Sequence, residues 1–202
     1  MQSIGKKYVL NIVLGLSISS LYANGIFTKN PKNSIATVLQ KEASPTFAPP
    51  FDRNEVEDFK EALAFKESQG NYQVVNTLGY LGKYQFGSTT LERFDILDTN
   101  AFLTNPALQE KAFVALCKVN KWILRKDIKR SVGKKINGIV ITESGILAAA
   151  HLAGAGNVEK FLRSNGTQTF SDAFGTTVEI YLEMFAAYDT SSIQPNRKPT
   201  IV

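Results

Sequence analysis

The chain has 202 residues, of which 44% are hydrophobic and 20% are charged, and its net charge is +5. This length and composition suit one domain with a hydrophobic core and exclude two domains of substantial size. Because the chain has one cysteine and one histidine, it can form no internal disulfide. Zinc hydrolases and catalytic triads supported by a second histidine are nearly excluded as well.

The first 25 residues are typical of a secretory signal peptide. Lys6 and Lys7 precede an apolar run over residues 8–22, and small residues follow at 23–25. A basic start, a short apolar stretch and a small-residue exit are the features of such a signal. We therefore expect an exported protein that works in the periplasm or outside the cell. An uncleaved membrane anchor is the main alternative and would be the only contact with a membrane, and a buried helix is another.

Residues 26–50 contain four of the seven prolines and little hydrophobic periodicity. This composition predicts a linker between the export signal and the folded part of the chain. The folded domain is expected over residues 51–189. Residues 190–202 are polar and contain proline, which predicts a flexible tail.

The first predicted helix begins with a capping-box pattern, in which Asp52 is followed three positions later by Glu55. Apolar residues then recur on one face at helical spacing, and Gly70 marks the end of the helix. The next segment, residues 72–86, is rich in β-branched and aromatic residues and is interrupted by asparagine and glycine. It predicts a small β-hairpin or irregular strands.

Further helices are predicted after this segment from capping residues and helical periodicity. They are a short helix from Thr89, a long helix from Pro106 to about Lys126, and helices at residues 145–153, 157–163 and 176–188. The expected fold class is therefore mostly α (α+β), with one small β element inserted early.

Positive charge is concentrated between Lys118 and Lys135, where eight lysines and arginines accompany one aspartate. A basic surface suits any polyanion, including nucleic acid, membrane headgroups and the anionic bacterial wall. A solvated helix face explains the same charges at least as well. Because no nucleic-acid-binding module and no interleaved aromatic residues accompany the charges, a nucleic-acid partner is not expected.

Glu67 is the candidate catalytic residue. It follows Leu63 by four positions and Phe59 by eight, so it projects from the apolar face of its helix. It also lies in the last helical turn, at the negative end of the helix dipole. Both effects favour the protonated carboxyl group, the form in which a general acid protonates a glycosidic oxygen. A carboxylate that simply extends past the helix end into solvent is the alternative.

Three sequence segments follow Glu67 in order over about 90 residues. They read ESQGNY at residues 67–72, GYLGKYQFG at 79–87 and AAHLAGAGNV at 149–158. Their order resembles the soluble lytic transglycosylases and goose-type lysozymes, whose pattern is a catalytic Glu-Ser-x-Gly, a glycine-rich segment ending in Gln, and an Ala-Tyr-Asn-Ala-Gly-like helix end. The middle segment is also similar to resuscitation-promoting-factor-like and phage wall-degrading domains. The resemblance covers roughly residues 52–188.

This resemblance implies a lysozyme-like helical domain that cleaves the β-1,4 bond between N-acetylmuramic acid and N-acetylglucosamine in peptidoglycan. Glycan strands would be its partner, Glu67 its acid, and neither a metal nor a cofactor would take part. Two positions depart from the family pattern, because His151-Leu152 replaces Tyr-Asn and Tyr84-Gln85-Phe86 replaces Leu-Met-Gln. The expected fold and site layout rest on this likeness.

Four further residues are predicted to bind the substrate. The Gln85 amide can orient an N-acetyl or hydroxyl group of a sugar. Because some side chains of an alternating segment must point into the core, we expect Tyr84 to face the groove and Phe86 to face the core. His151 lies on an alanine-rich helix and suits a hydrogen-bonded core position better than a catalytic one. The Tyr181 hydroxyl, at the edge of an amphipathic stripe, can reach the cleft.

No aspartate or glutamate lies between Glu67 and Glu92. A hydrolytic lysozyme normally uses a second carboxylate as nucleophile or base. Lytic transglycosylases instead use one glutamate as the acid and then as the base on the 6-hydroxyl of the muramic acid residue. The missing acid therefore favours a lytic transglycosylase that leaves 1,6-anhydro ends. The alternatives are a hydrolytic muramidase, whose second carboxylate would be Asp95, Asp98 or Glu143, and a non-catalytic peptidoglycan-binding module.

Overall fold

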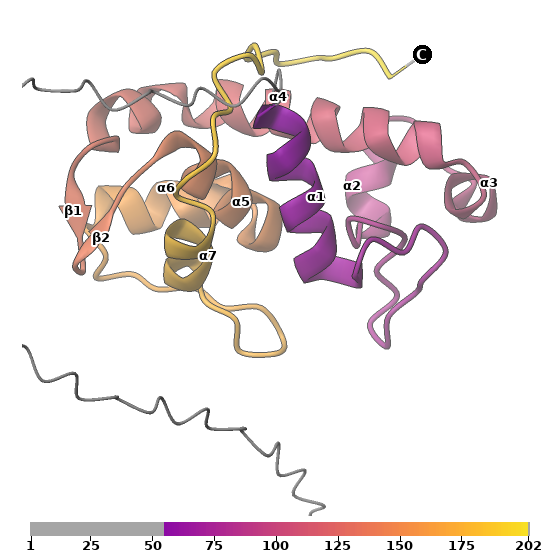
Figure 1. The fold of residues 1–202 in the computed structure, drawn as a ribbon, viewed down its shortest axis with the longest axis horizontal. Coiled ribbons are helices and arrows are strands. Elements are labelled where there is room, and N and C mark those ends of the chain that lie inside the picture. The colour runs from indigo at the N-terminus through magenta and orange to yellow at the C-terminus, as the bar shows by residue number, and fades with distance from the viewer. Residues whose placement is uncertain (1–54, 202) are drawn as a thin grey trace, which may run out of the picture. The chain divides into compact units, whose positions relative to one another are not determined.

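Helices account for most of the regular structure. The computed structural model describes residues 55–201, so the predicted signal peptide, the linker and the capping residue Asp52 lie outside the described residues. Within residues 55–201 the chain forms seven α-helices and one two-stranded antiparallel sheet (Figure 1). In chain order they are α1 (Glu55–Ser68), α2 (Ser88–Glu92), α3 (Thr99–Leu103), α4 (Pro106–Ser131), β1 (Lys135–Ile136), β2 (Ile139–Val140), α5 (Glu143–Ala153), α6 (Ala155–Arg163) and α7 (Val178–Met184). The mostly α (α+β) fold class is confirmed. None of the helices in this range is long and apolar enough to span a bilayer.

α4 is the longest helix, and α3, α5 and α6 all pack against it. The Asn105 side chain caps its start by accepting a hydrogen bond from the Leu108 backbone N–H at 3.0 Å, and Pro106 occupies the first turn. The helix continues past the predicted end at Lys126 as far as Ser131.

α5 contacts α4, α6 and α7, and its residues 144–150 are buried. Thr142 caps α5 by accepting a hydrogen bond from the Gly145 N–H at 3.2 Å. A Cβ atom at Gly145 would lie only 2.5 Å from the backbone oxygen of Leu182, so glycine is what allows α7 to approach α5 this closely. The contact places α7, and with it Tyr181, against the helices of the core.

α1 enters the core through Phe59 and Leu63, which are both fully buried. The Phe59 ring packs against Phe113 of α4 and against Phe185, directly after α7, with centroid separations of 6.1 and 6.2 Å. The helix ends where Gln69 and Gly70 adopt left-handed conformations, with φ of 56° and 79°. The end of α1 is therefore fixed both by packing and by its stop signal.

The β element lies elsewhere than predicted. Residues 72–86 form no strand and contain only the isolated bridges Val75↔Leu81 and Leu81↔Phe86. The sheet is instead the β1–β2 hairpin, whose two-residue turn is Asn137-Gly138 with φ of 50° and 85°. Asn-Gly is a strong hairpin signal because both residues tolerate positive φ.

Residues 190–201, which the sequence predicts to be flexible, are instead anchored to the helices. The Thr190 backbone oxygen accepts a hydrogen bond from Lys121 of α4 at 3.0 Å, and its hydroxyl donates to Glu143 of α5 at 2.9 Å. The Asn196 N–H donates to the Lys118 carbonyl at 3.0 Å, and the Ile193 side chain is buried. Polar and proline-rich composition therefore does not make this segment a free tail.

Candidate functional site

The Glu67 carboxylate lies in a cavity of about 500 Å³ at the C-terminal end of α1. Its side chain is half-buried and continues the face of α1 that carries Phe59 and Leu63. The Tyr181 hydroxyl of α7 donates a hydrogen bond to Glu67 Oε1 at 2.6 Å. Two helices therefore meet at this carboxyl group, one supplying the acid and the other its hydrogen-bond donor.

The same cavity is lined by four of the five residues predicted to form the site. These are Glu67, Gln85, His151 and Tyr181. They come from α1, the 72–86 segment, α5 and α7, so the tertiary fold gathers residues that lie more than 100 positions apart, as Glu67 and Tyr181 do. Such a convergence of polar side chains in one concave site is typical of ligand-binding and active sites.

Tyr84 faces the core, so the expectation that it faces the groove is wrong. Its ring is fully buried and stacks on Phe113 at a centroid separation of 4.1 Å, and its hydroxyl donates to Glu110 Oε2 at 2.7 Å. Burial first, and then the hydrogen bond and charge of Glu110, raise the pKa of Tyr84. The alternation assumed for an extended strand fails because Gly82 and Gln85 have φ of 71° and 50°. The predicted core position of Phe86 is confirmed.

Tyr80 is the aromatic residue of this segment that lines the Glu67 cavity. Its ring is partly exposed and lies against Gly87, where an added Cβ would be 3.4 Å from the ring. A tyrosine ring held at the cavity edge can contact the face of a bound sugar.

Gln85 and His151 fasten the cavity wall as well as lining it. The His151 Nε2 atom donates to the Tyr84 backbone oxygen at 2.7 Å, since a carbonyl oxygen can only accept. The Gln85 Nε2 atom donates to the Gly82 oxygen at 2.9 Å. The His151 ring also packs against Phe86 and Phe113. His151 therefore joins α5 to the 72–86 segment, and Gln85 closes a turn within that segment.

Tyr181 has a buried ring and a hydroxyl directed at Glu67. Burial first, and then the charge of Glu67 and the hydrogen bond to it, raise the pKa of Tyr181. The charge of Asp172 raises the pKa further. The phenol consequently remains protonated at neutral pH and can act as a permanent donor to the carboxyl group.

A second carboxylate lines the cavity, and the sequence reasoning missed it. Asp172 lies in the loop before α7, and its Oδ1 atom accepts hydrogen bonds from the backbone N–H groups of Phe174 and Thr176 at 2.9 and 2.7 Å. One of its two oxygens is therefore committed to shaping its own loop. Asn157 and Phe174 also line the cavity without having been predicted.

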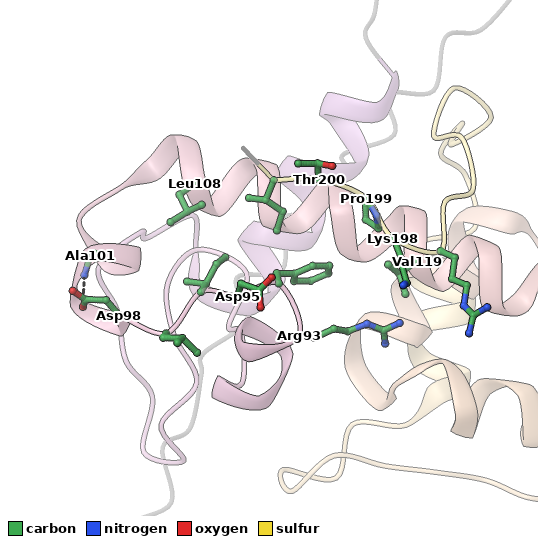
Figure 2. Close-up of a pocket in the computed structure, with 14 residues that line it drawn as sticks. Arg93, Asp95, Asp98, Ala101, Leu108, Val119, Lys198, Pro199 and Thr200 are labelled. Carbon is green, nitrogen blue, oxygen red and sulfur yellow. Dashed lines mark hydrogen bonds between the residues drawn. The ribbon is translucent and has the colours of Figure 1, made fainter.

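The three alternative carboxylates lie away from Glu67. Glu143 is bound by the Lys121 ammonium at 2.7 Å and by the hydroxyl of Thr190. Asp95 and Asp98 line a different cavity of about 860 Å³, which the C-terminal residues 197–201 help to close (Figure 2). Asp98 is used there as the cap of α3, accepting from the Ala101 N–H at 2.9 Å. None of the three lines the Glu67 cavity.

No cluster of three or more metal-ligating side chains occurs within residues 55–201. Comparison of the chain with protein-family models, with curated proteins and with solved structures gives no match.

Proposed function

We propose that this protein is a peptidoglycan lytic transglycosylase with a lysozyme-like fold, in which Glu67 is both acid and base. The observation that carries the proposal is the half-buried Glu67 carboxyl group in a cleft, with the protonated Tyr181 hydroxyl 2.6 Å from Oε1. A carboxyl group restrained in this way has little freedom to swing into solvent, which suits proton transfer to a bound ligand. The order of the motifs around Glu67, Gln85 and residues 149–158 supports the same assignment by likeness.

Glu67 would first donate its proton to the glycosidic oxygen while the bond between that oxygen and C1 of the muramic acid residue breaks. The carboxylate would then take the proton of the C6 hydroxyl on the same ring, whose oxygen bonds to C1. Glu67 regains its proton, no water is consumed, and the product has a 1,6-anhydro end. The attack is favoured because well-oriented intramolecular nucleophiles reach effective molarities on the order of 10⁵ M or more.

A hydrolytic muramidase is the second candidate, and the position of Asp172 favours it. Asp172 lines the same cavity as Glu67 and could activate a water in place of the C6 hydroxyl. Against this, the hydrogen bonds that Asp172 Oδ1 accepts from its own loop suit a structural part. This balance supports the single-glutamate route as the first choice.

Mass spectrometry of the soluble products released from purified peptidoglycan tests the proposal. We expect products with 1,6-anhydro ends, each lighter by one water than its hydrolytic counterpart. Glu67→Gln should lower the rate by about 10²-fold to 10⁴-fold or more, while the exposed Glu92→Gln on α2 serves as the matched control.

Three results would contradict the proposal in different ways. A Glu67→Gln variant with wild-type activity would show that Glu67 is neither the acid nor the base of the reaction. Free reducing ends that disappear in Asp172→Asn would establish the hydrolytic route. Binding of peptidoglycan by the wild-type protein without any soluble product would indicate a non-catalytic binding module.

A further inference from the structure

Two loops of this chain share one sequence pattern. Residues 76–80 read Asn-Thr-Leu-Gly-Tyr, and residues 172–176 read Asp-Ala-Phe-Gly-Thr. Each loop begins with an asparagine or aspartate, has a large apolar residue at its third position and has glycine at its fourth. The first loop follows α1 in the chain, and the second loop precedes α7.

The two loops also share one set of hydrogen bonds. The Asn76 Oδ1 atom accepts from the N–H groups of Leu78 and Tyr80 at 2.9 and 3.0 Å. Asp172 Oδ1 makes the equivalent two bonds within its own loop. The backbone N–H groups of Asn76 and Asp172 donate to the fifth residue's oxygen at 3.0 and 2.9 Å in the respective loops. Each loop is therefore closed by the side chain and the backbone of its own first residue.

The glycines complete this geometry. Gly79 and Gly175 have φ of 81° and 84°, and their N–H groups donate to the first residue's oxygen at 3.0 and 3.2 Å. A residue with a side chain rarely adopts this backbone conformation. The two loops are thus the same turn, built twice in one chain.

The third residue of each loop is held out toward solvent. Leu78 is 51% exposed and Phe174 is 67% exposed, yet both line the Glu67 cavity. Tyr80, at 43% exposure, lines it as well. Figure 1 shows the two loops on the same side of the molecule as the C-terminal end of α1. Apolar side chains are therefore presented at the rim of a cavity whose wall carries the polar residues Gln85 and Asn157.

We propose that the two loops form a clamp that holds one pyranose ring of a glycan strand at the mouth of the Glu67 cavity. This inference rests on the proposed function. A pyranose ring has apolar C–H faces and a polar edge, and the site has the matching arrangement. Leu78 and Phe174 contact the faces, while the amides of Gln85 and Asn157 reach the hydroxyl and N-acetyl groups of the edge. Both amide nitrogens already donate within the chain, to Gly82 and Ala153 respectively, and a lipid chain would give these side chains no further hydrogen bond.

Binding of soluble glycan fragments from peptidoglycan tests the clamp when it is measured by calorimetry in the Glu67→Gln background, which prevents turnover. Leu78→Ala and Phe174→Ala should each weaken binding by about tenfold, the effect of removing one well-packed apolar contact. In the enzyme with Glu67 intact, the same changes should raise KM with little effect on kcat. Phe65→Ala is the matched control, because Phe65 is 70% exposed on α1 and does not line the cavity.

Gly175→Ala tests the loop geometry separately. An added methyl group there meets no atom within 4 Å, so the variant changes only the backbone preference. Gly133→Ala is its control, since Gly133 has φ of 83°, equally open surroundings and no place in the cavity. We expect weaker glycan binding in Gly175→Ala and unchanged binding in Gly133→Ala.

The outcomes separate the clamp from the proposed function. If the wild-type protein releases anhydro products and Glu67→Gln abolishes them, but the Leu78, Phe174 and Gly175 variants bind and turn over like the wild type, the clamp is overturned and the function stands. If Glu67→Gln remains active, the proposed function is overturned, and the clamp falls with it.

Discussion

The hydrogen bond between Tyr181 and Glu67 joins two side chains that are 114 positions apart. Because burial and the neighbouring carboxylates raise the pKa of Tyr181, its hydroxyl stays protonated at neutral pH and can donate a hydrogen bond there. The bond therefore fixes the orientation of the Glu67 carboxyl group without competing for its proton. Tyr181 is a positioning residue in the proposed reaction.

Tyr181→Phe isolates this bond, because the ring stays packed against Phe185 while the hydroxyl is lost. A hydrogen bond to a charged group contributes about 1.5–3 kcal/mol, so we expect kcat to fall by about tenfold to a hundredfold. The thermal unfolding midpoint should also fall by several degrees, because the same hydrogen bond is lost from the folded state. Tyr188→Phe is the control, because Tyr188 does not line the cavity. An unchanged kcat in steady-state assays would remove Tyr181 from the catalytic arrangement.

Most of the site residues could be selected from sequence motifs, but not their orientations. Glu67 and Tyr181 lie on helical stripes, where spacing alone indicates the face. Tyr84 was misplaced because the period-two rule for strands does not hold where residues 82 and 85 have positive φ. Asp172 carries no motif and lies far from Glu67 in the chain. Its loop could have been found only by noticing that residues 172–176 repeat the pattern of residues 76–80.

At the scale of elements, buried polar groups hold the 72–86 segment in place of a strand ladder. Gln109 of α4 is fully buried; its Oε1 accepts from the Lys83 N–H, and its Nε2 donates to the Tyr72 oxygen, both at 2.9 Å. The Lys83 ammonium donates to Glu110 at 2.9 Å. Sequence patterns do not predict buried lysine, because lysine is almost never buried unless it is paired.

Glu110 is the centre of this polar cluster. Burial alone would raise its pKa, but hydrogen bonds from Lys60, Lys83, Tyr84 and Tyr72 outweigh the burial and lower the pKa from 4.5 to about 2. A carboxyl group with a lowered folded-state pKa stabilises the fold above its unfolded-state pKa. That contribution is lost progressively as the pH falls from 4.5 towards 2.

Glu110→Gln should therefore lower the free energy of unfolding at neutral pH by about 2 kcal/mol, because two lysines lose a half-buried anionic partner. Urea denaturation between pH 6 and pH 3 is the measurement. The wild type should lose stability below pH 4.5, and the variant should lose less over the same interval. Glu92→Gln is the control, since Glu92 is exposed on α2. If the free energy of unfolding changed with pH in the same way in the wild type and in Glu110→Gln, the stabilising role of the Glu110 carboxylate would be contradicted.

Helices with clear caps were the elements that the sequence predicted well. Asn105-Pro106 and Thr142 each satisfy free backbone N–H groups at a helix start, and this local chemistry can be read directly. α3 has five residues and was missed, since so short a helix has no hydrophobic repeat. The sheet was missed because its strands have two residues each, although Asn137-Gly138 marks its turn.

At the scale of the whole molecule, the C-terminal residues are part of the folded unit described by residues 55–201. Ile193 belongs to the hydrophobic core, and the Arg197 guanidinium lies over the Trp122 ring of α4 at 5.2 Å. The polar, proline-containing composition of residues 190–202 predicts a flexible tail because this segment has no periodic pattern of apolar residues. Composition does not report the single anchors, such as Ile193 and Thr190, that hold an irregular segment to a helix.

Ile193→Ala tests this anchoring. Removing a buried isoleucine side chain costs about 2–4 kcal/mol, whereas the same change in a flexible tail would cost nothing. We expect a lower denaturation midpoint in urea, with the slope of the transition unchanged. Ile180→Ala, at an exposed position of α7, should cost less than about 0.5 kcal/mol. Equal denaturation midpoints for Ile193→Ala and the wild type would support the prediction of a flexible tail.

The missing side chain at Gly145 has a consequence beyond helix packing. Gly145 does not line the Glu67 cavity, yet it sets how near α7 can stand to α5. Tyr181 is the neighbour of Leu182, the residue that a Cβ at position 145 would strike. A methyl group there would force α7 to shift against α5, and with α7 the Tyr181 hydroxyl, while every residue lining the cavity kept its identity. The alignment of the Tyr181 hydroxyl with the Glu67 carboxyl group therefore depends on the distance between α5 and α7. In the proposed reaction, a change in that distance would alter the rate although the residues around the substrate stayed the same.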